Sequence, residues 1–151
     1  MMRVLIINEL YQFGGAEVQT VREGNLLRRF GNESMLITLD DNFENGWIDE
    51  HHYNIGRKDG RIKQLYQRLF SDSEIVKTLR RLIQDFQPDY IHLNNANAHA
   101  ISIFKSVKAY KSLQTIRDYG AVCPNGFCIR RDLSMCNGCE NYAICTHNCF
   151  A

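Results

Sequence analysis

The stretch RVLIINELYQFGGAEVQTV, residues 3–21, joins an apolar run, a loop with two adjacent glycines and the start of a helical pattern. The run at residues 3–8 is short and rich in β-branched residues, which is typical of a strand buried on both faces of a parallel sheet. A helical pattern follows over residues 16–30, and Gly31 is suited to end that helix. The stretch therefore predicts one strand–turn–helix unit of an α/β fold.

Strand and helix patterns alternate along the rest of the chain. The strands are expected at residues 34–39, 51–55, 89–95 and 112–118, and the helices at residues 62–70, 75–86 and 98–110. Such alternation is typical of a parallel sheet with helices on both faces. We therefore predict an incomplete Rossmann-like α/β domain at residues 1–122, followed by a Cys-rich irregular segment at residues 123–151.

Three local features refine this prediction. Ser71, with Glu74 three residues later, predicts a capping box at the start of the helix at residues 75–86. His51 and His52 lie in a polar stretch and are expected to be solvated, whereas His92 lies within a strand pattern and is expected to be a core residue with its hydrogen bonds satisfied. The side chains expected to face the core from the helix at residues 98–110 are Ile101, Phe104 and Val107.

Composition narrows the functional classes. The formal net charge is +1, so the chain has no electrostatic field that would attract nucleic acid. The apolar run at residues 4–7 is too short for the core of a signal peptide or for a membrane span, which favours a cytoplasmic protein. In a reducing compartment, the six cysteines favour metal or thiol chemistry over structural disulfides.

Ligands of parallel α/β sheets bind beyond the carboxyl ends of the strands, so the loops that leave those ends hold the candidate site. Gly14 and Gly15 lie between a strand and a helix, where the backbone could approach a phosphate or a sugar hydroxyl. A tight turn without a ligand explains them equally well. The pattern is neither G-x-G-x-x-G nor a P-loop, so we expect no NAD.

Two further loops carry polar side chains. The run NNANAH places Asn95, Asn97 and His99 directly after a strand, where amides and an imidazole could bind sugar hydroxyls, although asparagine also suits turns. Arg117 and Asp118 end the last predicted strand. The aspartate could orient or deprotonate an acceptor hydroxyl and the arginine could bind a phosphate, or the two could form a surface ion pair.

The ordered set RVLIINELYQFGGAEVQTV, LLRRFGNESMLITLD, FQPDYIHLNN and TIRDYGAVCPNG resembles the N-terminal half of family 4 glycosyltransferases of the GT-B type. The resemblance implies the acceptor-binding domain of a retaining enzyme that moves a sugar from a nucleotide-sugar donor to a hydroxyl of a glycan or glycolipid. It implies that residues 14–17 face the interdomain cleft and that Arg117 and Asp118 line the acceptor side. Arg117 stands where many members have a histidine, so a role that needs histidine does not carry over.

The donor-binding domain of that family has no counterpart in these residues. We therefore expect the chain alone to be inactive and to need a donor-binding domain as a partner, in the same or a separate chain. Peripheral contact with the cytoplasmic face of the membrane and self-association are further expectations.

The cysteines gather at the end of the sequence. The set with zinc-ligand chemistry is Cys136, Cys139, Cys145 and Cys149. Cys123, Cys128 and His147 are spare ligands, and an iron–sulfur cluster, disulfides or free thiols are the alternatives. Two rival functions follow from this segment: a non-catalytic Rossmann-like binding module with a zinc-knuckle tail, and a thiol or iron–sulfur redox protein.

Overall fold

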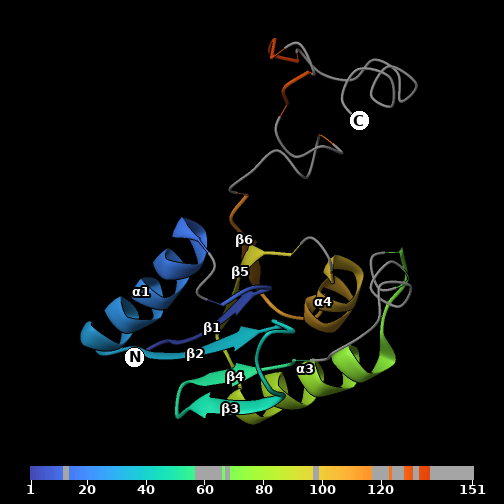
Figure 1. The fold of residues 1–151 in the computed structure, drawn as a ribbon. Coiled ribbons are helices and arrows are strands. Elements are labelled where there is room, and N and C mark those ends of the chain that lie inside the picture. The colour runs from blue at the N-terminus through green and yellow to red at the C-terminus, as the bar shows by residue number, and fades with distance from the viewer. Residues whose placement is uncertain are drawn as a thin grey trace. The chain divides into compact units, whose positions relative to one another are not determined.

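A computed structural model describes residues 1–11, 14–56, 66, 69–96, 99–116, 123, 128–130 and 133–136 of the chain. The chain divides into two compact units, Met1–Thr115 and Ile116–Ala151. The first unit holds the α/β fold drawn in Figure 1. In the described part of the second unit, Ile129 and Met135 form an antiparallel bridge. The predicted domain boundary after residue 122 stays a prediction.

The first unit contains a six-stranded sheet in the order β3-β4-β2-β1-β5-β6. The strands are β1 (Arg3–Asn8), β2 (Glu33–Thr38), β3 (Gly46–Asp49), β4 (His52–Asn54), β5 (Tyr90–Asn95) and β6 (Ser112–Gln114), and the described helices are α1 (Gly15–Arg29), α3 (Ser73–Phe86) and α4 (Ala100–Val107). Every neighbouring pair is parallel except β3 and β4, which are antiparallel. The predicted Rossmann-like α/β fold is therefore confirmed.

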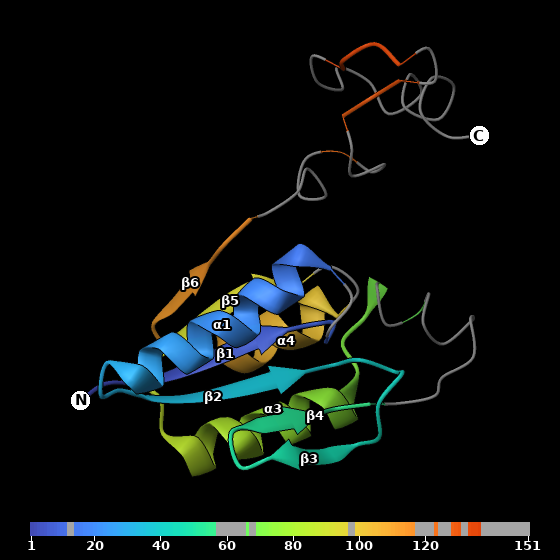
Figure 2. The ribbon, with the colours of Figure 1, turned by 60° about the vertical axis from the view of Figure 1, so that its left-hand side comes forward.

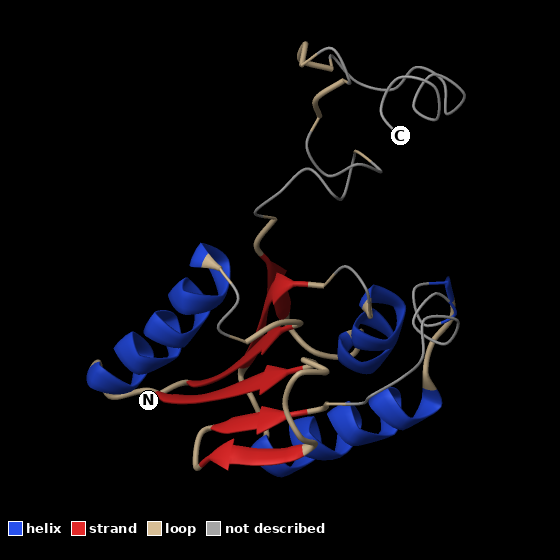
Figure 3. Ribbon diagram, in the orientation of Figure 1, coloured by secondary structure: helices blue, strands red, loops and turns tan. Residues whose placement is uncertain are grey.

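Helices cover both faces of the sheet, as Figures 2 and 3 show. Helix α1 packs on the face that carries Val4 and Ile6 of β1, whereas α3 and α4 pack on the face that carries Leu5 and Ile7. This alternation follows from the two-residue period of a strand, which sends successive side chains to opposite faces.

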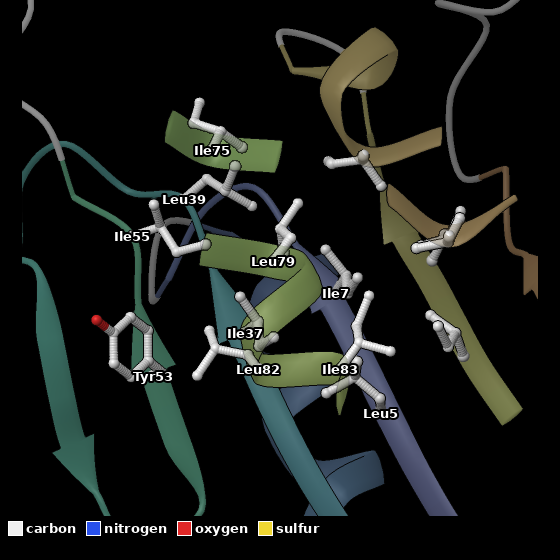
Figure 4. Close-up of a cluster of buried hydrophobic side chains, with 14 of the residues drawn as sticks. Leu5, Ile7, Ile37, Leu39, Tyr53, Ile55, Ile75, Leu79, Leu82 and Ile83 are labelled. Atoms are coloured by element: carbon white, nitrogen blue, oxygen red, sulfur yellow. The ribbon is translucent and has the colours of Figure 1, made fainter. Parts of the chain in front are cut away.

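The larger apolar core lies between the sheet and α3 with α4. Figure 4 shows Leu5 and Ile7 of β1 beside Leu79 and Ile83 of α3, and all four side chains are fully buried. Burying each such side chain contributes roughly 1.5–3 kcal/mol. The face under α1 has a smaller apolar cluster, and much of its remaining area carries polar side chains.

The edge of the sheet beyond β2 differs from the prediction. The strand predicted at residues 51–55 is β4, but the neighbouring strand β3 had no signal in the sequence because it is short and largely exposed. Strand β6 is likewise exposed and ends at Gln114, short of the predicted residue 118. The helix predicted at residues 62–70 falls largely outside the described residues.

Two helix predictions need correction. The first turn of α3 is capped by Asp72 and not by Ser71, because Oδ1 of Asp72 accepts hydrogen bonds from the backbone N–H groups of Glu74 (2.9 Å) and Ile75 (3.3 Å). On α4, Ile101 and Phe104 are each 42% exposed and do not face the core. The buried side chains of α4 are Ser102, Ile103, Ser106 and Val107.

The cap at Asp72 leads to a direct stability prediction. We expect Asp72→Ala to lower the free energy of unfolding by about 1 kcal/mol, because two N–H groups at the helix start lose their acceptor. Ser71→Ala removes only an exposed 3.3 Å hydrogen bond from Nζ of Lys105, so its effect should be much smaller. Chemical denaturation of both variants measures the difference, and equal losses would contradict the assignment of the cap.

A membrane-spanning helix would need a long apolar stretch. None of the helices in the described ranges is both long and apolar enough to cross a membrane.

Candidate functional site

The carboxyl ends of β1 and β5 lie side by side near the middle of the sheet. Asn8, the last residue of β1, pairs with Asn95, the last residue of β5. The helices that follow these strands, α1 and α4, lie on opposite faces of the sheet (Figure 3). The chain therefore leaves the two strand ends in diverging directions, and such a switch point is where parallel α/β sheets bind ligands.

Glu9 connects the loops around this switch point. Its Oε1 accepts a hydrogen bond from the backbone N–H of His99 (2.5 Å), and its backbone oxygen accepts one from the N–H of Leu39 (3.1 Å). The residue is only 6% exposed. Glu9 thereby ties together the segments that follow β1, β2 and β5. Sequence reasoning missed it, although an acidic residue directly after a buried strand was a usable signal.

Two buried polar atoms at the switch point have no hydrogen-bond partner within the described part of the chain: Oδ1 of Asn8 and Nδ1 of His99. Asn8 is 1% exposed, and its Nδ2 donates to the backbone oxygen of Leu10 at 2.6 Å. That bond fixes the orientation of the Asn8 amide. Its Oδ1 can therefore accept a hydrogen bond from a ligand. An unsatisfied buried polar group costs about 1–3 kcal/mol, so a ligand hydroxyl that satisfies it is favoured.

The predicted glycines stand at the start of α1, on the same edge of the sheet. Gly14 is the extended N-cap residue and offers no side-chain cap, and a Cβ at Gly15 would meet nothing within 4 Å. The buried Glu17 lies in the first helical turn, and its Oε2 would be 3.0 Å from a Cβ at Gly14. Because that carboxylate already occupies the positive end of the helix, the arrangement favours a hydroxyl over a phosphate.

A hydrogen-bonded network joins α1 to β5 beside the site. His92 contacts Oε1 of Glu23 through Nδ1 (2.5 Å) and Oγ1 of Thr115 through Nε2 (2.7 Å). Asn94 turns toward the same helix, and its Nδ2 donates to Oγ1 of Thr20 at 2.9 Å. His92 is hydrogen-bonded as predicted, but it is only partly buried and is not a core residue. This network holds α1 against the sheet and so fixes where its N-terminus lies.

The structure describes only some of the predicted site residues. The structure brings Asn95 and His99 to the switch point and Gly14 and Gly15 to the neighbouring helix start. Three further predicted residues lie outside the described residues: Asn97, Arg117 and Asp118.

The predicted metal set is placed at one residue only. The backbone N–H of Cys136 donates to the backbone oxygen of Cys128 (2.8 Å). These two cysteines therefore form the pair next to the Ile129–Met135 bridge. The remaining predicted ligands lie outside the described residues: Cys139, Cys145 and Cys149. Within the described ranges, no three or more His, Cys, Asp or Glu side chains form a metal site, so zinc stays a prediction.

Comparisons with known proteins give limited further information. No family model matches the chain. A 42.6 kDa uncharacterized protein in the cps region of Klebsiella pneumoniae is 23% identical over 146 residues, which cover 82% of this chain and 39% of the relative. The chain thus spans well under half the length of that relative.

A solved structure also aligns with the chain. It is a UDP-GlcNAc 2-epimerase from Methanocaldococcus jannaschii, with a TM-score of 0.47 and 12% sequence identity, over 76% of this chain and 31% of the epimerase chain. The α/β assignment rests on the sheet order and strand directions of this chain itself.

Proposed function

We propose that this chain is the acceptor-binding half of a retaining glycosyltransferase, which moves a sugar from a nucleotide-sugar donor to a hydroxyl of a glycan or glycolipid. The observation that carries the proposal is the pair of unsatisfied buried atoms, Oδ1 of Asn8 and Nδ1 of His99, at the β1–β5 switch point. Hydroxyl groups are both donors and acceptors, so the hydroxyls of a sugar suit an amide oxygen as well as an imidazole nitrogen.

Two further observations support a sugar over other ligands. The carboxylate of Glu17 at the start of α1 disfavours an anionic group there, as argued above. The ordered motifs around Gly14 and Gly15 resemble those of family 4 enzymes, and a relative from a cps (capsule) region agrees with polysaccharide biosynthesis.

In the proposed reaction, this chain holds the acceptor and a donor-binding domain holds the nucleotide sugar. Oδ1 of Asn8 would accept a hydrogen bond from one sugar hydroxyl, and the imidazole of His99 would contact a neighbouring one. Asp118, with Arg117 beside it, would orient the attacking hydroxyl, as the resemblance implies. Stabilisation of the leaving diphosphate belongs to the donor-binding domain, so the chain alone should not transfer sugar.

A binding experiment tests the proposal. The isotopically labelled chain is titrated with glucose, galactose, N-acetylglucosamine and oligosaccharides built from them, and separately with nucleotide sugars, while NMR shifts are recorded. We expect at least one glycan to shift signals of Asn8, Asn95 and His99, and nucleotide sugars to bind more weakly. Tighter binding of nucleotide sugars at this site, or sugar transfer by the chain alone, would contradict an acceptor-binding role.

A further inference from the structure

A hollow lies between α1 and the β2–β4 part of the sheet. Its volume is about 160 Å³, and it is called the α1 groove below. Its lining includes Tyr11, Arg28, Leu36, Asp49, His51 and His52. In Figure 2, α1 lies over one face of the sheet and α3 lies behind the sheet, on the opposite face.

The groove exists because β2 is followed by the β3–β4 hairpin and not by a helix on this face. Gly24 lies where α1 meets the sheet, since a Cβ there would be in ordinary contact with Cδ1 of Ile6 (3.7 Å) and Oγ of Ser34 (3.6 Å). The floor of the groove is therefore formed by strand side chains such as Leu36 and His52, and its walls are α1 and the turn at His51.

His52 is 3% exposed, so the prediction that it is solvated is wrong. Oγ1 of Thr38 donates its single proton to Oδ1 of Asn54 (2.7 Å) and must therefore accept from Nε2–H of His52 (2.8 Å). Nδ1 of His52 is then a hydrogen-bond acceptor. Burial lowers the pKa of His52, and this effect outweighs the charge of Asp49, which acts to raise that pKa. The imidazole is therefore neutral at neutral pH.

The lining indicates the class of ligand. The opposite charges of Arg28 and Asp49 offset each other, and His52 is neutral, so the groove favours neither an anion nor a cation. It offers hydrogen-bond donors and acceptors together with the ring of Tyr11, which packs at 4.4 Å between centroids against the ring of His52. This mixture suits a polyhydroxylated ring. The volume is well below the roughly 300–1,000 Å³ of sites for drug-sized ligands, which suits one ring.

We propose that the α1 groove is a second sugar subsite, which takes the next residue of a glycan whose terminal sugar is held at the switch point. The segment that follows β1 takes part in both sites. Oε1 of Glu9 accepts a hydrogen bond from the segment after β5, and the backbone N–H of Tyr11 donates to Oδ2 of Asp40, which follows β2 (2.9 Å). This inference rests on the proposed function and adds that the acceptor is an oligosaccharide.

The test compares His51→Ala with Glu50→Ala in the same titrations. His51 lines the groove, whereas Glu50 is its exposed neighbour and does not, although the two side chains contact each other at 3.3 Å. We expect wild type to bind a disaccharide or trisaccharide at least tenfold more tightly than the corresponding monosaccharide. His51→Ala should remove most of that gain without changing monosaccharide affinity, and Glu50→Ala should behave as wild type.

The outcomes separate the two proposals. If monosaccharides bind at Asn8 and His99 but longer glycans bind no more tightly, or His51→Ala changes nothing, the subsite is wrong and the switch-point site stands. If glycans shift only groove signals such as those of Tyr11 and His52, the switch-point site is wrong, and the groove is then not a continuation of it, so the subsite as proposed is overturned too. If no glycan in the panel binds, both are overturned.

Discussion

We expect Gly56→Ala to be the most damaging small substitution in the first unit of the chain. A Cβ at this position would lie 1.9 Å from the backbone oxygen of Phe43 and 2.7 Å from Nδ2 of Asn54. Neither atom can easily move, because Nδ2 of Asn54 donates to that same oxygen at 3.1 Å and to the oxygen of Asp40 at 3.0 Å. The loss in the free energy of unfolding should reach about 3 kcal/mol or more, at or beyond the upper end of ordinary overpacking.

Gly24→Ala is the matched control for this substitution. Every atom near a Cβ at Gly24 lies at an ordinary contact distance of 3.6 or 3.7 Å, and the residue is inside α1. Replacing a helical glycine by alanine should stabilise the protein by roughly 0.5–1 kcal/mol. Chemical denaturation followed by circular dichroism measures both variants. Similar midpoints for the two would mean that the loop around Phe43 does not pack on Gly56 as described.

The second large effect is expected at His99, where stability and binding should change in opposite directions. Its Nδ1 is buried without a partner in the described structure, and its side chain makes no cap bond to α4. His99→Phe should therefore leave the free energy of unfolding unchanged or raise it by up to about 1 kcal/mol, since it removes an unsatisfied polar atom. The backbone N–H that donates to Glu9 is kept.

The same substitution should weaken glycan binding by at least tenfold. That factor corresponds to about 1.4 kcal/mol, within the range for a lost hydrogen bond to a buried group. His51→Ala serves as the matched histidine control, because it should leave monosaccharide affinity unchanged. A His99→Phe variant that binds monosaccharides as well as wild type would remove His99 from the site, whatever its stability.

The sheet could be predicted from the sequence because its central strands β1 and β2 are built around apolar runs. Five of the six residues in each of these strands are buried, β5 buries Ile91 and Leu93, and the amphipathic α3 returns the chain to the centre of the sheet. Strand β3 carried no such signal, since an exposed edge strand need not be apolar. On α4, apolar spacing favoured the face with Ile101 and Phe104 as the buried one. The structure instead buries the face with Ser102 and Ser106.

The candidate site was harder to predict, for a physical reason. Asn95 and His99 were found because polar residues after a buried strand stand out in the sequence. Asn8 was hidden because it ends an apolar strand, and its role depends on a hydrogen bond to Leu10 that fixes its amide orientation. Glu9 had a usable signal in its place directly after a buried strand, but its hydrogen bond to the backbone of a residue far along the chain could not be predicted. Such relations depend on the register between β1 and β5, which residue spacing does not specify.

The central claim is that sugar hydroxyls bind to Asn8 and His99. The most direct measurement is the NMR signal of the Asn8 side-chain amide during titration of the labelled chain with the glycan that binds most tightly. We predict that this signal and the ring signals of His99 shift in a saturable way with the same affinity. Saturable binding that leaves both residues unshifted would contradict the account.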